Sequence, residues 1–404
     1  MMNVDYREAI RLLTDRADRI GTQKLDIQSA FGRILGEDIT ACENVPPFDR
    51  SPYDGYAFMA SDTEGVCPDR PVTLAVIENI RAGQMPQHKI THGTAIRLMT
   101  GAPIPEGADA VCKYEDTEYT DEAVTIRRSY SLGNNIITAG EDIKKGTLVA
   151  RKGYPVDAGI SGTLASLGIL SVSVYKRPVA GLITTGDEVT EPEDELLPGK
   201  IRNSNRYIIS AALKNIGIDT VFLGHANDTT KDIAELITQG EASCDIIIST
   251  GGVSVGDYDL VPDAMEKCGF KILVRGVIMK PGMACAYGIK NNKLMLALSG
   301  NPASSLTNLQ CICYPALKKI AGYASYDHEI LRFKLGTDIL KAGGQGVRFV
   351  RGRSVIREGQ LYLDTPSAQG NVVISSAVLC NAYGILSGLK SPVTSGTYID
   401  GFFV

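Results

Sequence analysis

Glycines and acidic side chains follow a series of apolar runs in the second half of the chain. Because a short apolar run bounded by Gly or Asp is typical of a buried strand, these residues are expected at strand ends. Five such groups occur: Gly186-Asp187-Glu188, Asn227-Asp228, the stretch from Gly251 to Asp259, Lys280-Pro281-Gly282 and Gly300-Asn301-Pro302.

This combination favours an anionic ligand bridged by a hard cation. Glycines let backbone N–H groups approach an anion, and a helix beginning at Asn301-Pro302 adds a positive dipole end. Acids among phosphate-binding turns would repel the ligand unless Mg²⁺ lies between them, so Glu188 and Asp259 are the metal candidates. One such group alone is an ordinary turn, but five on consecutive strand ends predict a phosphate-containing ligand.

Two further segments combine turn residues with polar side chains. Residues 46–57 read PPFDRSPYDGYA, and residues 97–107 read RLMTGAPIPEG. By composition alone the second is a β-turn, whereas the first is unusually rich in aromatic residues and proline for a turn.

The elements that must position these residues change character along the chain. Residues 5–20 show the spacing of an amphipathic helix, and residues 44–145 consist of short β-branched runs separated by Gly, Pro and Asp. Residues 178–322 alternate strands and helices, ending in one long helix from Asn301, which predicts a mostly parallel sheet covered by helices. Residues 328–404 return to strands and predict a small β-barrel or sandwich.

Composition narrows the class of protein. The 404 residues carry a net charge of −5, which argues against broad nucleic-acid binding, and no run approaches the roughly 20 apolar residues of a membrane span. Four histidines without metal-binding spacing make a zinc enzyme improbable, and nine cysteines without CxxC are best explained as small buried residues. The N-terminus lacks a signal-peptide core, so a cytoplasmic protein is expected.

Taken together, these segments resemble the molybdopterin molybdenumtransferase family, the MoeA-type proteins that include the gephyrin E domain. The resemblance covers nearly the whole chain. Its motifs, in order, are FGRILGEDI (31–39), FDRSPYDGYA (48–57), RLMTGAPIPEGADAV (97–111), AGEDIKKG (139–146), ASLGI (165–169), TTGDEV (184–189), STGGVSVGDYD (249–259), MKPG (279–282), SGNPASS (299–305) and VRG (350–352).

The resemblance implies a transferase of molybdenum cofactor biosynthesis. Adenylylated molybdopterin and molybdate would bind together, and a Mg²⁺-dependent step would insert molybdenum and release AMP. The expected partners are these two substrates, a second copy of the chain in a homodimer, and the molybdopterin adenylyltransferase, with no nucleic acid and no membrane. A non-catalytic molybdopterin-binding scaffold or carrier, a paralogue handling tungstate, and an adenylyltransferase remain alternatives.

The resemblance also implies an α/β multidomain fold of four parts. These are a linking domain (21–43 with 146–177), a β-rich inserted domain (44–145), a mostly parallel α/β molybdopterin-binding domain (1–20 with 178–326) and a C-terminal β-barrel domain (327–404). In such dimers the cleft lies between the α/β domain of one subunit and the β-rich insert of the other.

Carried over by motif, the catalytic positions are Asp54, Thr100, Glu188, Asp228 and Asp259, with Glu188 and Asp259 as metal ligands. The substrate-binding positions are Asp142, Gly251, Gly252, Ser254, Gly256, Lys280, Gly300, Asn301, Pro302 and Arg351. The chain departs from the family pattern at Gly276, where a basic residue is common, and at Met283, Ser299 and Asn371. These departures reduce the number of groups expected to bind oxyanions.

Overall fold

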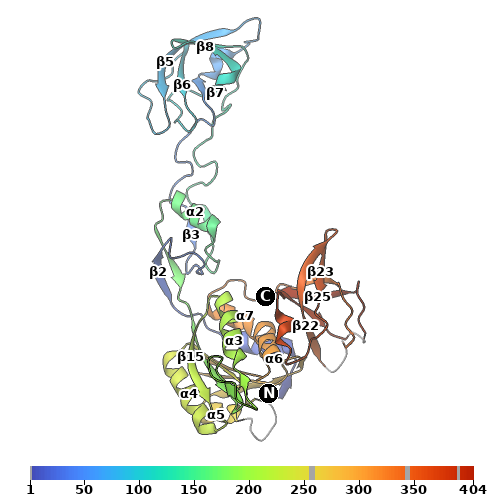
Figure 1. The fold of residues 1–404 in the computed structure, drawn as a ribbon. Coiled ribbons are helices and arrows are strands. Elements are labelled where there is room, and N and C mark those ends of the chain that lie inside the picture. Colours follow the sequence, from blue (N-terminus) through green and yellow to red (C-terminus); the bar gives the residue numbers. More distant parts are fainter. Residues whose placement is uncertain (1, 254–259, 342–345, 389–391) are drawn as a thin grey trace. The chain divides into compact units, whose positions relative to one another are not determined.

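A computed structural model describes residues 2–253, 260–341, 346–388 and 392–404 (Figure 1). Its contacts divide the chain into two compact units. One comprises Met1–Glu37, Lys152–Asp157 and Ser171–Val404, and the other comprises Asp38–Arg151 and Ala158–Leu170. We call them the α/β-barrel unit and the β-rich unit; the finer four-domain boundaries stay a prediction. In the described ranges no helix is long and apolar enough to cross a membrane.

A seven-stranded sheet forms the centre of the α/β-barrel unit. Its strand order is β1 (Met2–Val4), β17 (Lys271–Val277), β19 (Cys285–Lys290), β20 (Lys293–Leu298), β16 (Ile246–Thr250), β12 (Val179–Thr185) and β15 (Asp219–Ala226). The pairs β1–β17, β16–β20, β12–β16 and β12–β15 are parallel, and only β19 runs against its neighbours. The expected mostly parallel sheet is therefore confirmed.

Helices cover both faces of this sheet. The helices α1 (Tyr6–Thr14), α3 (Ser204–Asn215), α6 (Pro302–Asn308) and α7 (Tyr314–Ile320) pack into one hydrophobic core, whereas α4 (Thr230–Ser243) and α5 (Val261–Lys267) pack into the other. Apolar side chains of the central strands alternate between the two cores, as Ile246 and Ile247 do, because successive strand residues point to opposite faces.

Several elements differ from the sequence prediction. The helix expected over 5–20 covers only Tyr6–Thr14, and Asp5 caps its start. After Thr14 the hydrogen bonds are of the 3₁₀ type, from the N–H of Arg16 to the carbonyl oxygen of Leu13 and from the N–H of Ala17 to that of Thr14, so the α-helix ends there. The strand β19 was not predicted; the turn Asn291-Asn292, with positive φ at both residues, returns it antiparallel into β20.

The long helix expected from Asn301 is broken into α6, a π turn (Leu309–Cys313) and α7. Pro315 has no N–H to donate to the carbonyl oxygen of Cys311, which would be its partner in a continuous α-helix. That carbonyl instead lies 3.1 Å from Nε2 of His328.

The C-terminal strands close into a barrel, as expected. The ring runs β22 (Val347–Arg357), β23 (Gln360–Asp364), β21 (Leu331–Leu335), β25 (Tyr398–Phe403) and β24 (Ala382–Leu386), and β24 pairs back onto β22. The short strand β18 (Met279–Lys280) joins the edge of β22. The 3₁₀ turn Ile374–Ala377 precedes β24, and two short ladders, β2 (Thr22–Asp26) with β11 (Ser171–Tyr175) and β13 (Val189–Thr190) with β14 (Ile201–Arg202), complete the unit.

The β-rich unit is built on a curled six-stranded sheet. Its order is β7 (Ala110–Lys113), β4 (Gly55–Phe58), β6 (Thr94–Leu98), β5 (Val72–Ile80), β9 (Ala123–Ile126) and β8 (Thr117–Tyr119). Two hydrophobic cores lie on its two faces, around Phe58 and around Ile96. The ladder of β3 (Ile39–Thr40) with β10 (Leu148–Ala150), the helix α2 (Ala158–Ser166) and the 3₁₀ turns Ala60–Thr63 and Tyr114–Asp116 complete it.

Candidate active site

A cleft of about 1180 Å³ opens at the carboxyl ends of the parallel strands in the α/β-barrel unit. This edge is where α/β sheets bind ligands. The structure brings together here most of the predicted residues of this unit: Glu188, Asp228, Gly251, Gly252, Lys280, Gly300, Asn301 and Pro302 all line the cleft. Ser254, Gly256 and Asp259 lie outside the described residues.

The wall after β16 is a tight glycine turn. Gly251 and Gly252 adopt φ of 100° and 61°, and a Cβ on Gly251 would lie 2.4 Å from Oγ1 of Thr185. A Cβ on Gly300 would lie 3.4 Å from Cα of Gly251, so the turns after β16 and β20 nearly touch. The absence of side chains therefore lets two backbone turns form one surface of the cleft.

A buried amide fixes the turn that begins α6. Nδ2 of Asn205 donates to the carbonyl oxygen of Gly300 at 2.7 Å, and Oγ of Ser305 donates to Oδ1 of the same asparagine at 3.1 Å. Because Asn205 is buried on α3, this link sets the position of the Gly300-Asn301-Pro302 turn relative to the neighbouring helix.

The acids of two adjacent strand ends crowd one side of the cleft. The N–H of Asp187 donates to Oδ2 of Asp228 at 3.4 Å, and the N–H of Asp228 donates to Oδ1 of Asp187 at 3.3 Å. Burial raises the pKa of Asp228, and the charges of Asp187 and Glu188 raise it further against the lowering effect of the Asp187 N–H. A cation placed here would relieve this repulsion.

The donor set at this edge fits Mg²⁺, which prefers carboxylate oxygens and retains places for substrate oxygens. Glu188 and Asp228 supply such oxygens in the cleft. No cluster of three or more His, Cys, Asp or Glu side chains suited to a metal occurs among the described residues, so the protein would furnish only part of a coordination shell. Asp259, the second predicted metal ligand, is not among those residues.

Basic side chains line the opposite part of the cleft. Lys280 and Arg275 are both exposed there. Arg202 also lines the cleft, but it donates to the carbonyl oxygens of Pro192 and Asp194 at 2.5 and 3.1 Å. Arg275 precedes Gly276, the position where the family commonly has a basic residue. It was not among the residues predicted for the site, yet it places a cation in the cleft.

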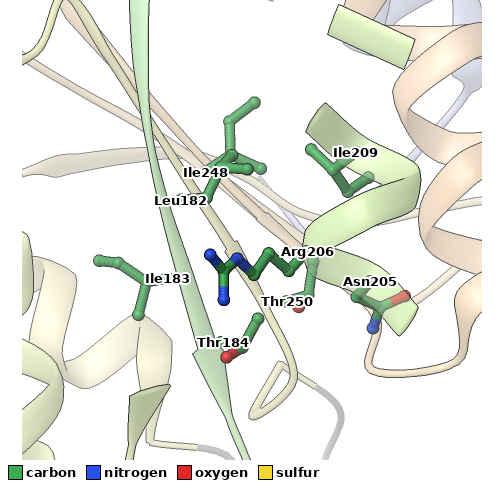
Figure 2. A pocket seen from close by; sticks show the side chains of 8 residues that line it. All are labelled: Leu182, Ile183, Thr184, Asn205, Arg206, Ile209, Ile248 and Thr250. Carbon is green, nitrogen blue, oxygen red and sulfur yellow. The ribbon is translucent and has the colours of Figure 1, made fainter. Parts of the chain in front are cut away.

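A further cation on α3, Arg206, does not line the cleft and is held by contacts within the unit. Figure 2 shows its side chain extending from α3 toward β12, across a small pocket that leaves no room for a water molecule. It pairs with Glu191 at 2.7 Å and lies 4.2 Å from the ring centre of Phe222. These contacts give Arg206 a structural role between α3, β15 and Glu191.

Hydroxyl groups at the floor of the cleft were missed by the sequence analysis. Thr185 and Thr250 end β12 and β16, are each 4% exposed, and have side-chain oxygens without a hydrogen-bond partner in the described protein. Such groups are costly unless a ligand or water satisfies them. The available signal was their position as the last residues of the apolar runs VAGLITT and CDIIIST.

Arg351 does not line the cleft. It is 1% exposed, and its guanidinium donates to Oγ of Ser376 at 2.8 and 3.0 Å and to Oγ1 of Thr307 at 2.9 Å. These bonds join β22 and α6 to the segment that carries Asn371, which does line the cleft. Direct oxyanion binding by Arg351 stays a prediction, while its observed contacts support the cleft wall.

The remaining predicted residues lie in the β-rich unit. The N–H and Oγ1 of Thr100 donate to Oδ1 of Asp54 at 2.7 and 2.8 Å. These two bonds, together with the charge of Arg97, lower the pKa of Asp54. Asp142 is exposed, and its N–H donates to the carbonyl oxygen of Val45 at 3.1 Å. The structure thus pairs Asp54 with Thr100, and it gives no contact between this pair and Asp142.

The departures from the family pattern share one location. Gly276, Met283, Ser299 and Asn371 all line the cleft of the α/β-barrel unit. Gly276 has φ of 86°, and a Cβ there would lie 2.5 Å from Oδ1 of Asn3, itself a cleft residue. If the expected departures hold, they would therefore act on the cleft itself and not on the remainder of the unit.

The doubly covered α/β sheet, the strand-edge cleft and the added barrel and β-rich sheet define a multidomain ligand-binding enzyme. Residues 4–168 match the model of the MoeA N-terminal region (domains I and II), and residues 181–319 match the probable molybdopterin binding domain. The chain belongs to the molybdopterin molybdenumtransferase family, and it is a transferase of molybdenum cofactor biosynthesis.

Relatives and solved structures agree over nearly the full length. The molybdopterin molybdenumtransferase of Bacillus subtilis (strain 168) is 35% identical over 97% of this chain and 92% of its own length. That of Staphylococcus epidermidis RP62A is 32% identical over 98% and 94%. The crystal structure of the molybdopterin biosynthesis MoeA protein from Pyrococcus horikoshii OT3 superimposes with a TM-score of 0.86 at 30% identity over 100% of both chains.

Proposed function

We propose that the protein inserts molybdate into adenylylated molybdopterin in a Mg²⁺-dependent reaction that releases AMP. The observation that carries the proposal is the cleft itself, where Glu188 and Asp228 lie on strand ends that also present glycine turns and the cations Arg275 and Lys280. Separate acidic and basic groups in one cleft suit a substrate that carries both a phosphoanhydride and an oxyanion.

The chain's own residues have distinct parts in this proposal. The N–H of Gly252 would donate to a phosphate group at the turn after β16, whereas the N–H of Gly251 already donates to the carbonyl oxygen of Leu298 at 3.0 Å. Lys280 and Arg275 would balance the charge of molybdate and hold it beside the bound pterin. The hydroxyls of Thr185 and Thr250 would orient the ligand from the floor of the cleft.

Mg²⁺, held by Glu188 and, in this proposal, Asp228 or Asp259, would supply Lewis-acid polarisation of a phosphoryl oxygen. Asp228 is a candidate because burial, and after it the charges of Asp187 and Glu188, raise its pKa, and a cation beside it would stabilise its charged form. The carboxylates would otherwise repel the substrate.

Three broader features belong to the same proposal. The protein works in the cytoplasm, as a homodimer, and receives its substrate from a molybdopterin adenylyltransferase. Asp54, Thr100 and Asp142 of the β-rich unit would serve the cleft of the other subunit. These statements rest on the resemblance to the family, whose models match both units.

The decisive experiment incubates the purified chain with adenylylated molybdopterin, Mg²⁺ and molybdate, and measures AMP. We expect AMP release that requires both ions and is lost in Glu188→Gln without a change in thermal stability. Tight pterin binding without AMP release would identify a carrier instead. Faster release with tungstate would identify a tungstate-handling paralogue, and ATP consumption with free molybdopterin would identify an adenylyltransferase.

A further inference from the structure

Three buried polar atoms without partners gather on one face of the sheet in the β-rich unit. They are Nε of Arg97 and the hydroxyls of Tyr56 and Tyr114, none of which has a hydrogen-bond partner in the described protein. Tyr56 of β4 lies directly opposite Arg97 of β6, so their side chains share a face.

Aromatic rings enclose the guanidinium. Cζ of Arg97 lies 4.6 Å from the ring centre of Tyr114 and 5.8 Å from that of Tyr119, and the rings of Tyr56 and Tyr114 are 5.3 Å apart. We call Tyr56, Arg97, Tyr114 and Tyr119 the Arg97 cluster. Among the described residues Arg97 makes no ion pair within 4.0 Å, although its charge contributes to the lowered pKa of Asp54.

The same unit contains a comparable group of residues whose polar atoms are satisfied. Nε of Arg128 donates to the hydroxyl of Tyr130 at 2.8 Å, and its Nη2 donates to Asp116 at 2.7 Å. Arginine and tyrosine side chains in this unit can therefore bond to one another and to an acid. The Arg97 cluster is built from the same residue types, yet its three atoms remain without acceptors.

Each of the three atoms can donate a hydrogen bond, and one belongs to a permanent cation. A group that offers several acceptor oxygens and a negative charge would satisfy them together, and a tetrahedral oxyanion has that chemistry. We propose that the Arg97 cluster is an oxyanion-binding subsite of the β-rich unit, taking a phosphoryl group or molybdate. It lies next to the Asp54–Thr100 pair and extends beyond the proposed cleft chemistry.

Tyr119 is the exposed member of the Arg97 cluster. It is 52% exposed and lies on β8, a three-residue strand at the edge of the sheet. Its ring packs against Tyr114 at 4.8 Å and Tyr56 at 6.0 Å. An oxyanion would therefore reach the buried donors by displacing one side chain on a short edge strand.

The test uses the full chain carrying Lys280→Ala, so that the cleft contributes less to binding. Inorganic phosphate and molybdate are titrated separately, and binding is followed by the NMR signal of the Arg97 Nε–H and by calorimetry. We expect a saturable shift of that signal. Tyr56→Phe and Tyr114→Phe should each raise Kd about fivefold, the loss of one hydrogen bond, and leave the Tm unchanged or higher.

Two variants sharpen the result. Tyr130→Phe is the matched control, because its hydroxyl has a partner, and it should lower the Tm without affecting Kd. Asp54→Asn should tighten binding, because it removes a negative charge near Arg97.

A shift with phosphate alone, with molybdate alone or with both supports the subsite and identifies the source of the oxyanion. The proposal is overturned if neither ion shifts the Arg97 signal, or if the two phenylalanine variants bind like the parent. The experiment measures binding and not turnover, so its outcome is independent of whether the protein releases AMP as proposed.

Discussion

Thr100 directs both its N–H and its hydroxyl to a single carboxylate oxygen of Asp54, at 2.7 and 2.8 Å. This arrangement leaves the other oxygen of Asp54 without a bond from Thr100. Because the two donors stabilise the charged form, the pKa of Asp54 is lowered, and the carboxylate stays ionised at any physiological pH.

Thr100→Val removes the hydroxyl donor and retains the N–H donor, so it should raise the pKa of Asp54 part of the way toward its ordinary range and hold the carboxylate less firmly. We expect kcat for AMP release to fall at least tenfold with little change in Tm, because both residues are exposed. Thr100→Ser retains both donors and should keep most of the activity. The ¹³C chemical shift of the Asp54 carboxyl, followed over pH, reports the pKa directly; an unchanged value in Thr100→Val would contradict this account.

The pKa of Asp228 is shifted in the opposite direction from that of Asp54, so its effect on stability should change with pH in the opposite sense. Its folded-state pKa is raised, so the folded protein holds this proton more tightly than the unfolded chain. That contribution to stability is present below the unfolded pKa and is lost as pH rises through the folded pKa. Asp228→Asn should therefore raise the Tm near pH 7.5 and have less effect near pH 4, as measured by thermal denaturation without Mg²⁺. An equal shift at both pH values would show that charge is not the cause.

Removal of the cleft cations should weaken anion binding in a salt-dependent manner. Arg275→Ala and Lys280→Ala are each expected to raise the Kd for AMP or molybdate about threefold to tenfold at low salt, and less at high salt because of screening. Lys231→Ala, with an 84% exposed side chain on α4, is the matched control and should bind normally. Equal effects of all three variants on Kd would show that the cleft cations have no special role in anion binding.

Thr185→Val should separate ligand binding from stability. The valine keeps the shape of threonine and removes a buried hydroxyl that has no partner. We expect an unchanged or higher Tm without ligand and a weaker affinity for the pterin substrate. A lower Tm would instead indicate that the hydroxyl is hydrogen-bonded within the ligand-free protein.

Tyr287→Phe tests a buried network beneath the Lys280-Pro281-Gly282 turn. The Tyr287 hydroxyl donates to Oδ1 of Asn308 at 2.5 Å, and Nδ2 of Asn308 donates to the Gly282 carbonyl oxygen at 2.8 Å. The phenylalanine leaves Asn308 short of a donor in the core, which should cost about 1–3 kcal/mol in denaturant unfolding. A neutral variant would show that the asparagine finds another donor.

The sequence predicted the elements whose signal is local. The parallel strands β12, β15 and β16 are apolar runs closed by turn residues, and the acids and glycines after them meet in one cleft because parallel strands present their carboxyl ends at a common edge. The family motifs then selected Asp54 and Thr100, which the structure joins by hydrogen bonds.

Features that depend on distant partners were not predictable. The strand β1 is defined by its pairing with β17, more than 260 positions later, and three residues carry too little pattern to reveal it. Arg351 looks like an anion ligand in its motif, but its acceptors lie on α6 and on the turn around Ser376. The missing partners of Tyr56 and Tyr114 become visible only when strands from separate parts of the chain form one face.

The strand β18 has a consequence for how this protein can vary. Lys280 lies in the cleft and is also paired with Arg348 on the first long strand of the barrel. If β18 shifted by one residue along β22, the ammonium group of Lys280 would move away from the anion that we propose it binds. The barrel therefore helps to set the position of Lys280, so a change within the barrel can alter the cleft without replacing Lys280 itself.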